Sequence, residues 1–216
     1  MVKENWIILP GGFGRWVHPV YRKDVGEISG VVDTVYQYAT EHETRPYGGT
    51  PIFGNAVNTV HEYGMKYCVA INFGGLFGNF YPGTYHLLHP ETWIKDPLGD
   101  AVQRCCINNP DFVAKTKEFY NDLLEKYPID AVGFDEPFPS PCVCEHCQKK
   151  FKEEKGRQMP NEPDPETMEF HGDSLIKYMG LICDIAKKRG LRTVVIVVPR
   201  PEKVDIEVLQ KRWGRK

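Results

Sequence analysis

The sequence has no long hydrophobic run and no excess of charge of either sign. Its longest apolar run, residues 194–198, is far shorter than the ~20 residues that cross a bilayer. We therefore expect no membrane span and no secretory leader, as in a cytoplasmic protein. The 27 basic residues nearly balance the 29 acidic ones, so charge gives no reason to expect nucleic acid as a partner.

Internal repeats and low-complexity segments are also missing, while hydrophobic residues make up 41% of the 216. That share is enough for a core and excludes a disordered tail or a coiled coil. We expect one domain over residues 1–216, the usual size of a single folding unit.

Apolar runs and helical periodicity alternate along the chain. The predicted strands are residues 5–10, 34–39, 66–72, 129–134 and 191–198. The predicted helices are residues 52–63, 109–127, 146–155 and 175–186. Residues 73–108, rich in Gly, Pro and aromatics, show no period and are expected to form a functional loop. Alternating apolar strands and helices predict an α/β fold with a parallel sheet.

Three of the seven cysteines have the spacing of a metal site. Cys142, Cys144 and Cys147 form C-x-C-x-x-C, and Cys105 or Cys106 is a possible fourth ligand. Thiolate sulfur is a preferred ligand of tetrahedral zinc, and four thiolates leave no open position, so the zinc would be structural. The alternatives are reduced thiols, or one disulfide with a spare cysteine.

Two adjacent carboxylates, Asp135 and Glu136, directly follow the predicted strand 129–134. Catalytic groups of parallel α/β folds collect at the carboxyl ends of strands. Burial and a charged neighbour raise the pKa of a carboxyl group, which suits a general acid near neutral pH. The alternative is a solvated strand-end pair that caps the next turn.

The run 133–137, the motif 142–147 and Phe151 together resemble glycoside hydrolase TIM barrels. The likeness is nearest to family 42 β-galactosidases and to uncharacterised glycosidase-like barrels with the same cysteine motif after strand 4. Arg104 followed by Cys106, Asn108 and Pro110 is close to that family's Arg and Cys-x-Asn-x-Pro pattern. The resemblance implies a structural zinc with Cys106 as fourth ligand.

In that family the Glu after the fourth strand is the general acid/base, which the resemblance places at Glu136. Asp135 stands where the family has Asn and would accept a hydrogen bond from a sugar hydroxyl. A retaining mechanism also needs a nucleophilic carboxylate roughly 5–5.5 Å away. Glu41, Glu43 and Glu202 are candidates by position, although none matches a family motif.

The resemblance implies a TIM (β/α) barrel-like fold, yet the five predicted strands fall short of the eight of a closed barrel. We therefore expect an incomplete or truncated barrel, or one that a second copy of the chain completes. Trp93 is expected to stack on a sugar face, with His89 and Arg104 bonding its hydroxyls. Loop packing is the alternative role for Trp93.

These features predict a glycoside hydrolase-like protein that cleaves O-glycosidic bonds, with carbohydrate as its partner. One alternative is a catalytically inactive carbohydrate-binding or scaffold protein on a truncated barrel. Another is a thiol-based redox or metal-handling protein. His18, His61 and His171 show no ligand spacing and are expected to be surface or packing residues.

Overall fold

The computed structural model describes residues 6–8, 20–38, 52–72, 85–135 and 137–196. The strands are β1 (Trp6–Ile8), β2 (Thr34–Tyr38), β3 (Lys66–Asn72), β4 (Trp93–Lys95), β5 (Ala101–Cys105), β6 (Ala131–Asp135) and β7 (Arg192–Ile196). The helices are α1 (Val20–Ile28), α3 (Ile52–Glu62), α4 (Tyr85–Leu88), α5 (Pro110–Lys126), α6 (Glu145–Lys155) and α7 (Pro165–Lys187), with a 3₁₀ turn, η1 (Pro90–Thr92).

The main sheet is parallel throughout and follows the order of the chain, β1-β2-β3-β6-β7. At least one helix separates each strand from the next. In a doubly wound sheet the strand order reverses partway, whereas here every strand is added on the same side. The prediction of a parallel α/β fold is confirmed, and this is the strand order of consecutive units of a (β/α) barrel.

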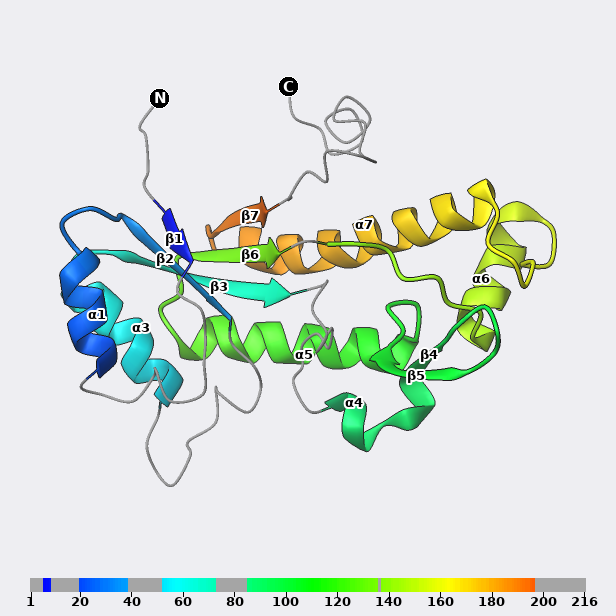
Figure 1. Cartoon of the computed structure of the whole chain (residues 1–216), viewed down its shortest axis with the longest axis horizontal. Coiled ribbons are helices and arrows are strands. Elements are labelled where there is room, and N and C mark those ends of the chain that lie inside the picture. The colour runs from blue at the N-terminus through cyan, green and yellow to red at the C-terminus, as the bar shows by residue number, and fades with distance from the viewer. Residues whose placement is uncertain (1–5, 9–19, 39–51, 73–84, 136, 197–216) are drawn as a thin grey trace.

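The sheet is open among the described residues, with β1 and β7 at its edges. Register places the last residues of three strands level with one another: Asn72 lies opposite Asp135, and Asp135 opposite Ile196. The carboxyl ends of β3, β6 and β7 therefore form one edge. In Figure 1 the arrowheads of β3 and β6 point along the molecule, toward the end that carries α6, β4 and β5.

The main core lies between the sheet and the helices. Residues 131–134 of β6 are all buried, as expected of a strand covered on both faces. Helix α5 packs against α7, where the rings of Phe112 and Tyr178 stack 5.9 Å apart and the hydroxyls of Thr116 and Tyr178 lie 2.9 Å apart. No helix in the described part of the chain is long and apolar enough to cross a membrane.

A second, smaller core lies at one end of the molecule. It contains Ile94, Phe151, Met159 and Phe170 together with four cysteine side chains. In Figure 1 helix α7, about 35 Å long at 1.5 Å per residue, extends past the sheet to reach this end, where α6 and the β4–β5 hairpin also lie. The structure therefore has one core under the sheet and one around the cysteines.

The expected loop over residues 73–108 is partly wrong. Residues 73–84 lie outside the described residues, but 85–105 contain α4, η1 and the antiparallel β4–β5 hairpin. Strand β5 is exposed over its first three residues, so it shows no buried alternation in sequence. Helix α1 was not predicted either. The hairpin matters because the chain leaves it at Cys106, which lies in the second core.

Candidate metal centre and strand-end carboxylates

Four cysteines from two separate segments converge in the second core. Cys106 follows β5, whereas Cys142, Cys144 and Cys147 lie between β6 and the first turn of α6. All four side chains are buried, and their sulfur atoms lie within 4.8 Å of one another. The predicted metal-ligand set is therefore assembled, and Cys106 is the fourth member.

The sulfur geometry fits a tetrahedral ion. Zinc–sulfur bonds of about 2.3 Å place neighbouring sulfurs of a tetrahedron about 3.8 Å apart. The Cys106 and Cys147 sulfurs are 3.4 Å apart, and the Cys144 and Cys106 sulfurs 3.5 Å. Both distances are far longer than the ~2.05 Å of a disulfide, and all seven cysteines are free thiols. The centre can hold a metal ion of about this size.

Cys105 faces away from the centre although it adjoins Cys106. Its sulfur accepts a hydrogen bond from the Thr92 hydroxyl at 3.2 Å, and its side chain packs in the main core. Successive residues of an extended chain point to opposite sides, so only one of the two can face the cysteine motif. That residue is Cys106.

Polar groups of the protein surround the thiols. The Asn108 backbone N–H donates to the Cys106 sulfur at 3.4 Å, and the Asn108 side-chain amide donates to the Cys147 sulfur at 3.3 Å. The Cys142 N–H donates to Nε2 of His171 at 3.3 Å. Burial lowers the pKa of His171 to about 4, so its ring is neutral and able to accept this bond. His171 is thus a packing residue of the centre.

Hydrogen bonds among the thiols shift their acidity in opposite directions. Bonds from Cys106, Cys142 and Cys147 lower the pKa of the Cys144 thiol. Bonding to Cys142, Cys144 and Cys147 raises the pKa of Cys106. The hydrogen bond with Cys106 lowers the pKa of Cys142 as well, so the cluster favours thiolates at Cys142 and Cys144 and opposes ionisation of Cys106. A divalent cation binds thiolates and would ionise all four.

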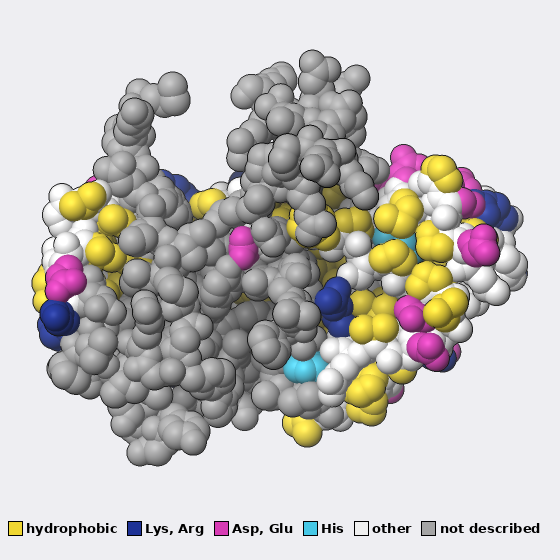
Figure 2. All heavy atoms as spheres, viewed as in Figure 1, with side chains coloured by type: hydrophobic (Ala, Val, Ile, Leu, Met, Phe, Trp, Pro, Cys, Tyr) yellow, Lys and Arg dark blue, Asp and Glu magenta, His cyan; other side chains and the backbone are white. Residues whose placement is uncertain are grey.

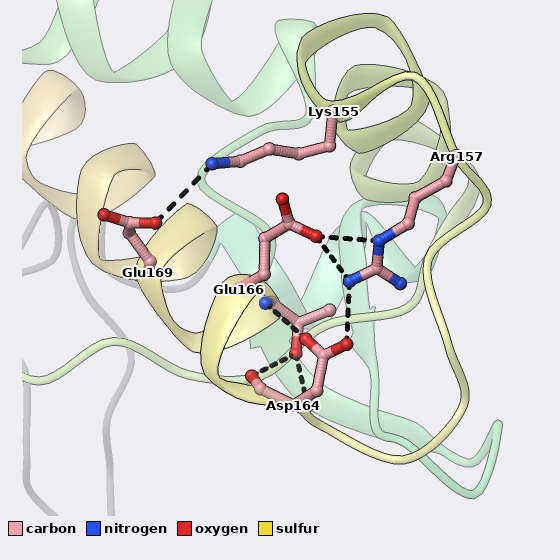
Figure 3. A network of polar contacts seen from close by, with 6 residues as sticks. Lys155, Arg157, Asp164, Glu166 and Glu169 are labelled. Atoms are coloured by element: carbon pink, nitrogen blue, oxygen red, sulfur yellow. Dashed lines mark hydrogen bonds and ion pairs between the residues drawn. The ribbon is translucent and has the colours of Figure 1, made fainter.

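A polar network ties the two helices behind the centre together (Figure 3). Arg157, just after α6, donates from Nε to Glu166 at 2.7 Å and from Nη2 to Asp164 at 2.7 Å. Lys155 and Glu169 lie 3.6 Å apart. These contacts join the end of α6 to the start of α7. They hold the two helices that supply the aromatic rings of the second core.

Arg104 lies beside the metal centre. It borders a cavity of about 20 Å³ that Cys106, Cys142 and Ser140 also line, room for about one water molecule. Its Nη1 donates to the Ser140 hydroxyl at 2.9 Å. Ser140 belongs to the segment between β6 and Cys142, so Arg104 anchors this segment to β5. The Val143 N–H donates to the Lys95 carbonyl at 2.8 Å and anchors it to β4.

The proposed catalytic pair begins at the last residue of β6. Asp135 is half-buried at the carboxyl edge of the sheet, level with the last residue of β3. Glu136 lies outside the described residues, as do Glu41, Glu43 and Glu202. The structure thus assigns Asp135 to the edge where catalytic groups of parallel folds collect.

Trp93 and His89 lie near one another, in and before β4. The indole N–H of Trp93 donates to the His86 carbonyl at 2.6 Å, and its side chain is half-buried. The His89 ring stacks on Tyr85 at 3.9 Å and its Nδ1 lies 2.7 Å from Glu91 Oε1. Both side chains thus make packing or polar contacts within the chain.

Hydrophobic side chains gather on the surface of this end of the molecule. Figure 2 shows them over the region that carries α6, β4 and β5. Exposed apolar residues there include Leu98, Val102 and Phe138. These apolar side chains therefore stay exposed on segments that adjoin the second core.

Three polar residues beside the metal centre were not predicted from the sequence to have a role there. Asn108 lies between β5 and α5, Lys150 on α6 and Ser174 on α7, and the three meet beside the cysteines. Asn108 is the Asn of the Cys-x-Asn-x-Pro pattern, so this pattern could have indicated that it lies at the metal centre. Lys150 resembles any other lysine of a charged helix, so no signal in the sequence distinguishes it.

Comparisons with known proteins leave the sequence family open. A scan against protein-family models and a search of curated proteins each found no match. Solved structures do match in fold. An α-L-fucosidase isoenzyme from Paenibacillus thiaminolyticus has a TM-score of 0.67 at 16% identity, covering 90% of this chain and 32% of that chain. A β-galactosidase from Bacillus circulans has a TM-score of 0.69 at 13% identity, covering 96% and 38%.

The chain thus spans about a third of the length of these two glycosidases. A hypothetical protein from Ruminiclostridium thermocellum matches with a TM-score of 0.54 at 10% identity, covering 89% of this chain and 96% of that chain. Identities this low define the fold alone. The chain has a glycosidase-like α/β fold with a four-cysteine centre that can hold a metal.

Proposed function

We propose that this chain is a glycoside hydrolase-like protein that hydrolyses O-glycosidic bonds, with Glu136 as general acid/base. The observation that carries the proposal is the position of Asp135 at the carboxyl end of β6, the fourth strand of a parallel sheet built in chain order. Glu136 is the next residue in sequence. The glycosidase-like fold makes a carbohydrate the substrate class that we propose.

The proposed chemistry divides the work between adjacent carboxyl groups. Glu136 would protonate the leaving glycosidic oxygen and later remove a proton from water. Asp135 would accept a hydrogen bond from a sugar hydroxyl, and its charge would help to keep Glu136 protonated. In the retaining form of the reaction a second carboxylate attacks the sugar, and we propose Glu41, Glu43 or Glu202 for that role.

We propose zinc as the metal of the four-cysteine centre, in a structural role. Bound zinc would supply a fixed tetrahedral junction between the residues after β5 and the residues after β6. The residues that would hold it are Cys106, Cys142, Cys144 and Cys147. The segment that leads from Asp135 to Cys142 would then be anchored at both ends. This arrangement would fix both ends of the segment that carries the acid/base.

We further propose that residues 1–216 form one barrel-like domain. The open edges of β1 and β7, among the described residues, favour an incomplete barrel. A second copy of the chain is one source of the missing strands. Trp93, His89 and Arg104 stay proposed as carbohydrate contacts.

The test replaces Glu136 by Gln in the purified, zinc-loaded chain and measures turnover of a panel of aryl glycosides. General acid catalysis contributes about 100-fold or more, so turnover should fall by at least that factor. A leaving group of low pKa needs little protonation. The loss should therefore be smallest for dinitrophenyl glycosides and largest for phenyl glycosides.

Two control variants separate this role from general damage. Glu153→Gln changes an exposed carboxylate of α6 and should leave turnover unchanged. Asp135→Asn restores the residue found in the resembled family and should retain activity. Equal turnover by the unmutated chain and Glu136→Gln, or none by the unmutated chain, would contradict the enzymatic proposal.

One alternative has an observation in its favour. The open sheet edges also fit a catalytically inactive carbohydrate-binding or scaffold protein, since a closed barrel normally surrounds such an active site. This alternative predicts that sugars bind equally well to the unmutated chain and to Glu136→Gln, with no turnover by either. Calorimetric titration with the same glycosides distinguishes the two functions.

A further inference from the structure

A metal centre of four thiolates has a charge problem. Four thiolates around one divalent cation leave a net negative charge, and a buried net charge is costly unless a nearby group offsets it. All four ligand side chains are buried. A cation of the protein close to the sulfurs would therefore stabilise the loaded centre.

Lys150 is placed to offset this charge. It lies on α6 one turn after Cys147, and its half-buried ammonium donates to the Asn108 side-chain oxygen at 2.6 Å and to the Ser174 hydroxyl at 3.4 Å. Among the described residues, no carboxylate lies within the 4.0 Å of an ion pair with it. Glu154 on the same helix pairs instead with Lys177, at 3.0 Å.

The ammonium also fixes which way the Asn108 amide points. A lysine ammonium can only donate hydrogen bonds, so the amide atom that faces it must be the oxygen. The amide nitrogen then faces the other way, where it donates to the Cys147 sulfur at 3.3 Å and to the Ser174 hydroxyl at 3.1 Å. One amide group thus separates the ammonium from a metal-ligand sulfur.

We propose that Lys150 is a positioning residue of the metal centre. It holds the Asn108 amide with its N–H groups toward the Cys147 thiolate, and its positive charge offsets part of the negative charge of the loaded centre. The ring of Phe170, whose centroid lies 5.7 Å from the Lys150 nitrogen, keeps the ammonium in place from another side. The inference rests on the proposed zinc site but not on the glycosidase activity.

The test measures how fast the zinc-loaded full chain gives up its metal to an excess of a colorimetric chelator. Partners that orient metal ligands contribute about 10- to 100-fold to metal affinity. Lys150→Met removes the charge and should release zinc faster by about that factor. Lys150→Arg keeps the charge and should stay close to the unmutated chain. Lys149→Met, at an exposed position of the same helix, should change nothing.

Cobalt(II) loading gives a second measurement, the absorption spectrum of the metal centre. A lysine that only stabilised the fold would leave this spectrum unchanged. The thiolate-to-cobalt absorption bands report on the hydrogen bonds and charge that the sulfurs receive. They should shift in Lys150→Met and return in Lys150→Arg. Asn108→Asp, which keeps Lys150 but replaces the amide donor by a carboxylate, should release zinc faster as well. It serves as the test if Lys150→Met does not fold.

The outcomes separate this inference from the proposed zinc site. An unmutated chain that takes up no zinc or cobalt would overturn both. Normal metal binding, with unmutated release rates and cobalt spectra in Lys150→Met and Asn108→Asp, would overturn the inference alone. If Lys149→Met released zinc as fast as Lys150→Met, the inference would also be overturned. Loss of any lysine from α6 would then accelerate zinc release.

Discussion

The adjacent residues Cys105 and Cys106 have different surroundings. The Cys105 sulfur accepts a hydrogen bond from Thr92 within the main core, and the Cys106 sulfur lies 3.4 Å from that of Cys147. Both side chains are buried to nearly the same extent, 4% and 1% exposed. They therefore offer a matched pair that separates metal binding from burial.

We expect Cys106→Ala to lose the metal and Cys105→Ala to keep it. Removal of one of four thiolates opens the coordination shell, whereas Cys105 contributes only packing and one hydrogen bond. The measurement is zinc per chain by mass spectrometry of the metal after dialysis. Equal zinc content in the two variants would contradict the assignment of Cys106 as fourth ligand.

The cysteine positions in the sequence predicted the metal ligands, but not the polar side chains that contact them. Three thiols within six residues are visible in sequence, and the pattern around Asn108 indicated Cys106. The contacts of Asn108 with Lys150 and Ser174 join positions 42 and 66 residues apart. They arise because α6 packs against α7, where the Phe151 and Phe170 rings are in contact, and no local pattern encodes that packing.

At the scale of the element, α5 begins as its sequence predicts. The Asn109 side chain accepts hydrogen bonds from the backbone N–H groups of Asp111 and Phe112, and Pro110 occupies the first turn. These groups would otherwise lack partners at a helix start. Because Asn109 follows the segment of Cys106, the cap also fixes the path of the chain away from the metal centre.

Asn109→Ala should lower the free energy of unfolding by about 1 kcal/mol, since the cap is lost. Asn109→Ser should retain most of it because a serine hydroxyl caps equally well. Chemical denaturation of the zinc-loaded chain measures both. A smaller loss in the alanine variant than in the serine variant would contradict this role.

Helix α7 begins with a charge-dependent cap. A backbone hydrogen bond from Thr167, and then the Arg157 guanidinium, lower the pKa of Asp164 below its ordinary value of 3.8. A carboxyl group whose pKa falls on folding stabilises the protein fully above its unfolded pKa and loses that contribution as the pH falls through the folded value. The stabilisation should thus be constant near neutral pH and disappear only below about pH 4.

The measurement compares the unmutated chain with Asp164→Asn in urea from pH 3 to pH 7. The difference in unfolding free energy should be constant from pH 5 to pH 7 and shrink at the acid end. A difference that instead grew toward acid pH would contradict the cap. Arg157→Met tests the second contribution in the same way, because it leaves the Thr167 bond in place.

Elements with buried periodicity were predictable, and those without it were not. Strand β3 has the predicted bounds, and α3 and α6 end within a residue of theirs. The hairpin was missed because β5 is mostly exposed. Helix α1 contains Gly26, a poor helix former. A Cβ there would lie 3.1 Å from the hydroxyl oxygen of the exposed Tyr63 side chain, so glycine leaves room for that ring against α1.

At the scale of the whole molecule, the two cores have different sources of stability. The main core contains large buried side chains such as Tyr67, Phe112 and Phe134, whereas the second contains few apolar groups around four thiols. A metal would replace the apolar area that the second core lacks, as it does in other small metal-dependent units. The alternation of elements predicted the first core, whereas the cysteine spacing predicted the metal ligands of the second but not the apolar residues around them.

Metal removal should therefore loosen one core and spare the other. With the zinc chelated, amide hydrogen exchange should accelerate across α6 and the β4–β5 hairpin, while β3 and β6 keep their protection. Exchange measured by mass spectrometry on loaded and chelated chain tests this. A uniform acceleration over all elements would show that the metal stabilises the molecule as a whole.

The closure of a barrel was not predictable from this chain. Parallel order follows from right-handed βαβ connections between neighbouring strands, which the alternation of strands and helices in the sequence indicates. Closure depends on what pairs with the edges of β1 and β7, and that is a long-range property. The parallel order of the sheet is therefore common to the prediction and to the described structure, whereas its closure into a barrel stays a prediction.

The central claim is that four cysteines from two segments, one after β5 and one after β6, bind one zinc. Zinc K-edge X-ray absorption of the purified full chain tests it most directly. The account predicts one zinc per chain with four sulfur ligands at about 2.3 Å. Absence of zinc, or a shell in which nitrogen or oxygen replaces any of these sulfurs, would contradict it.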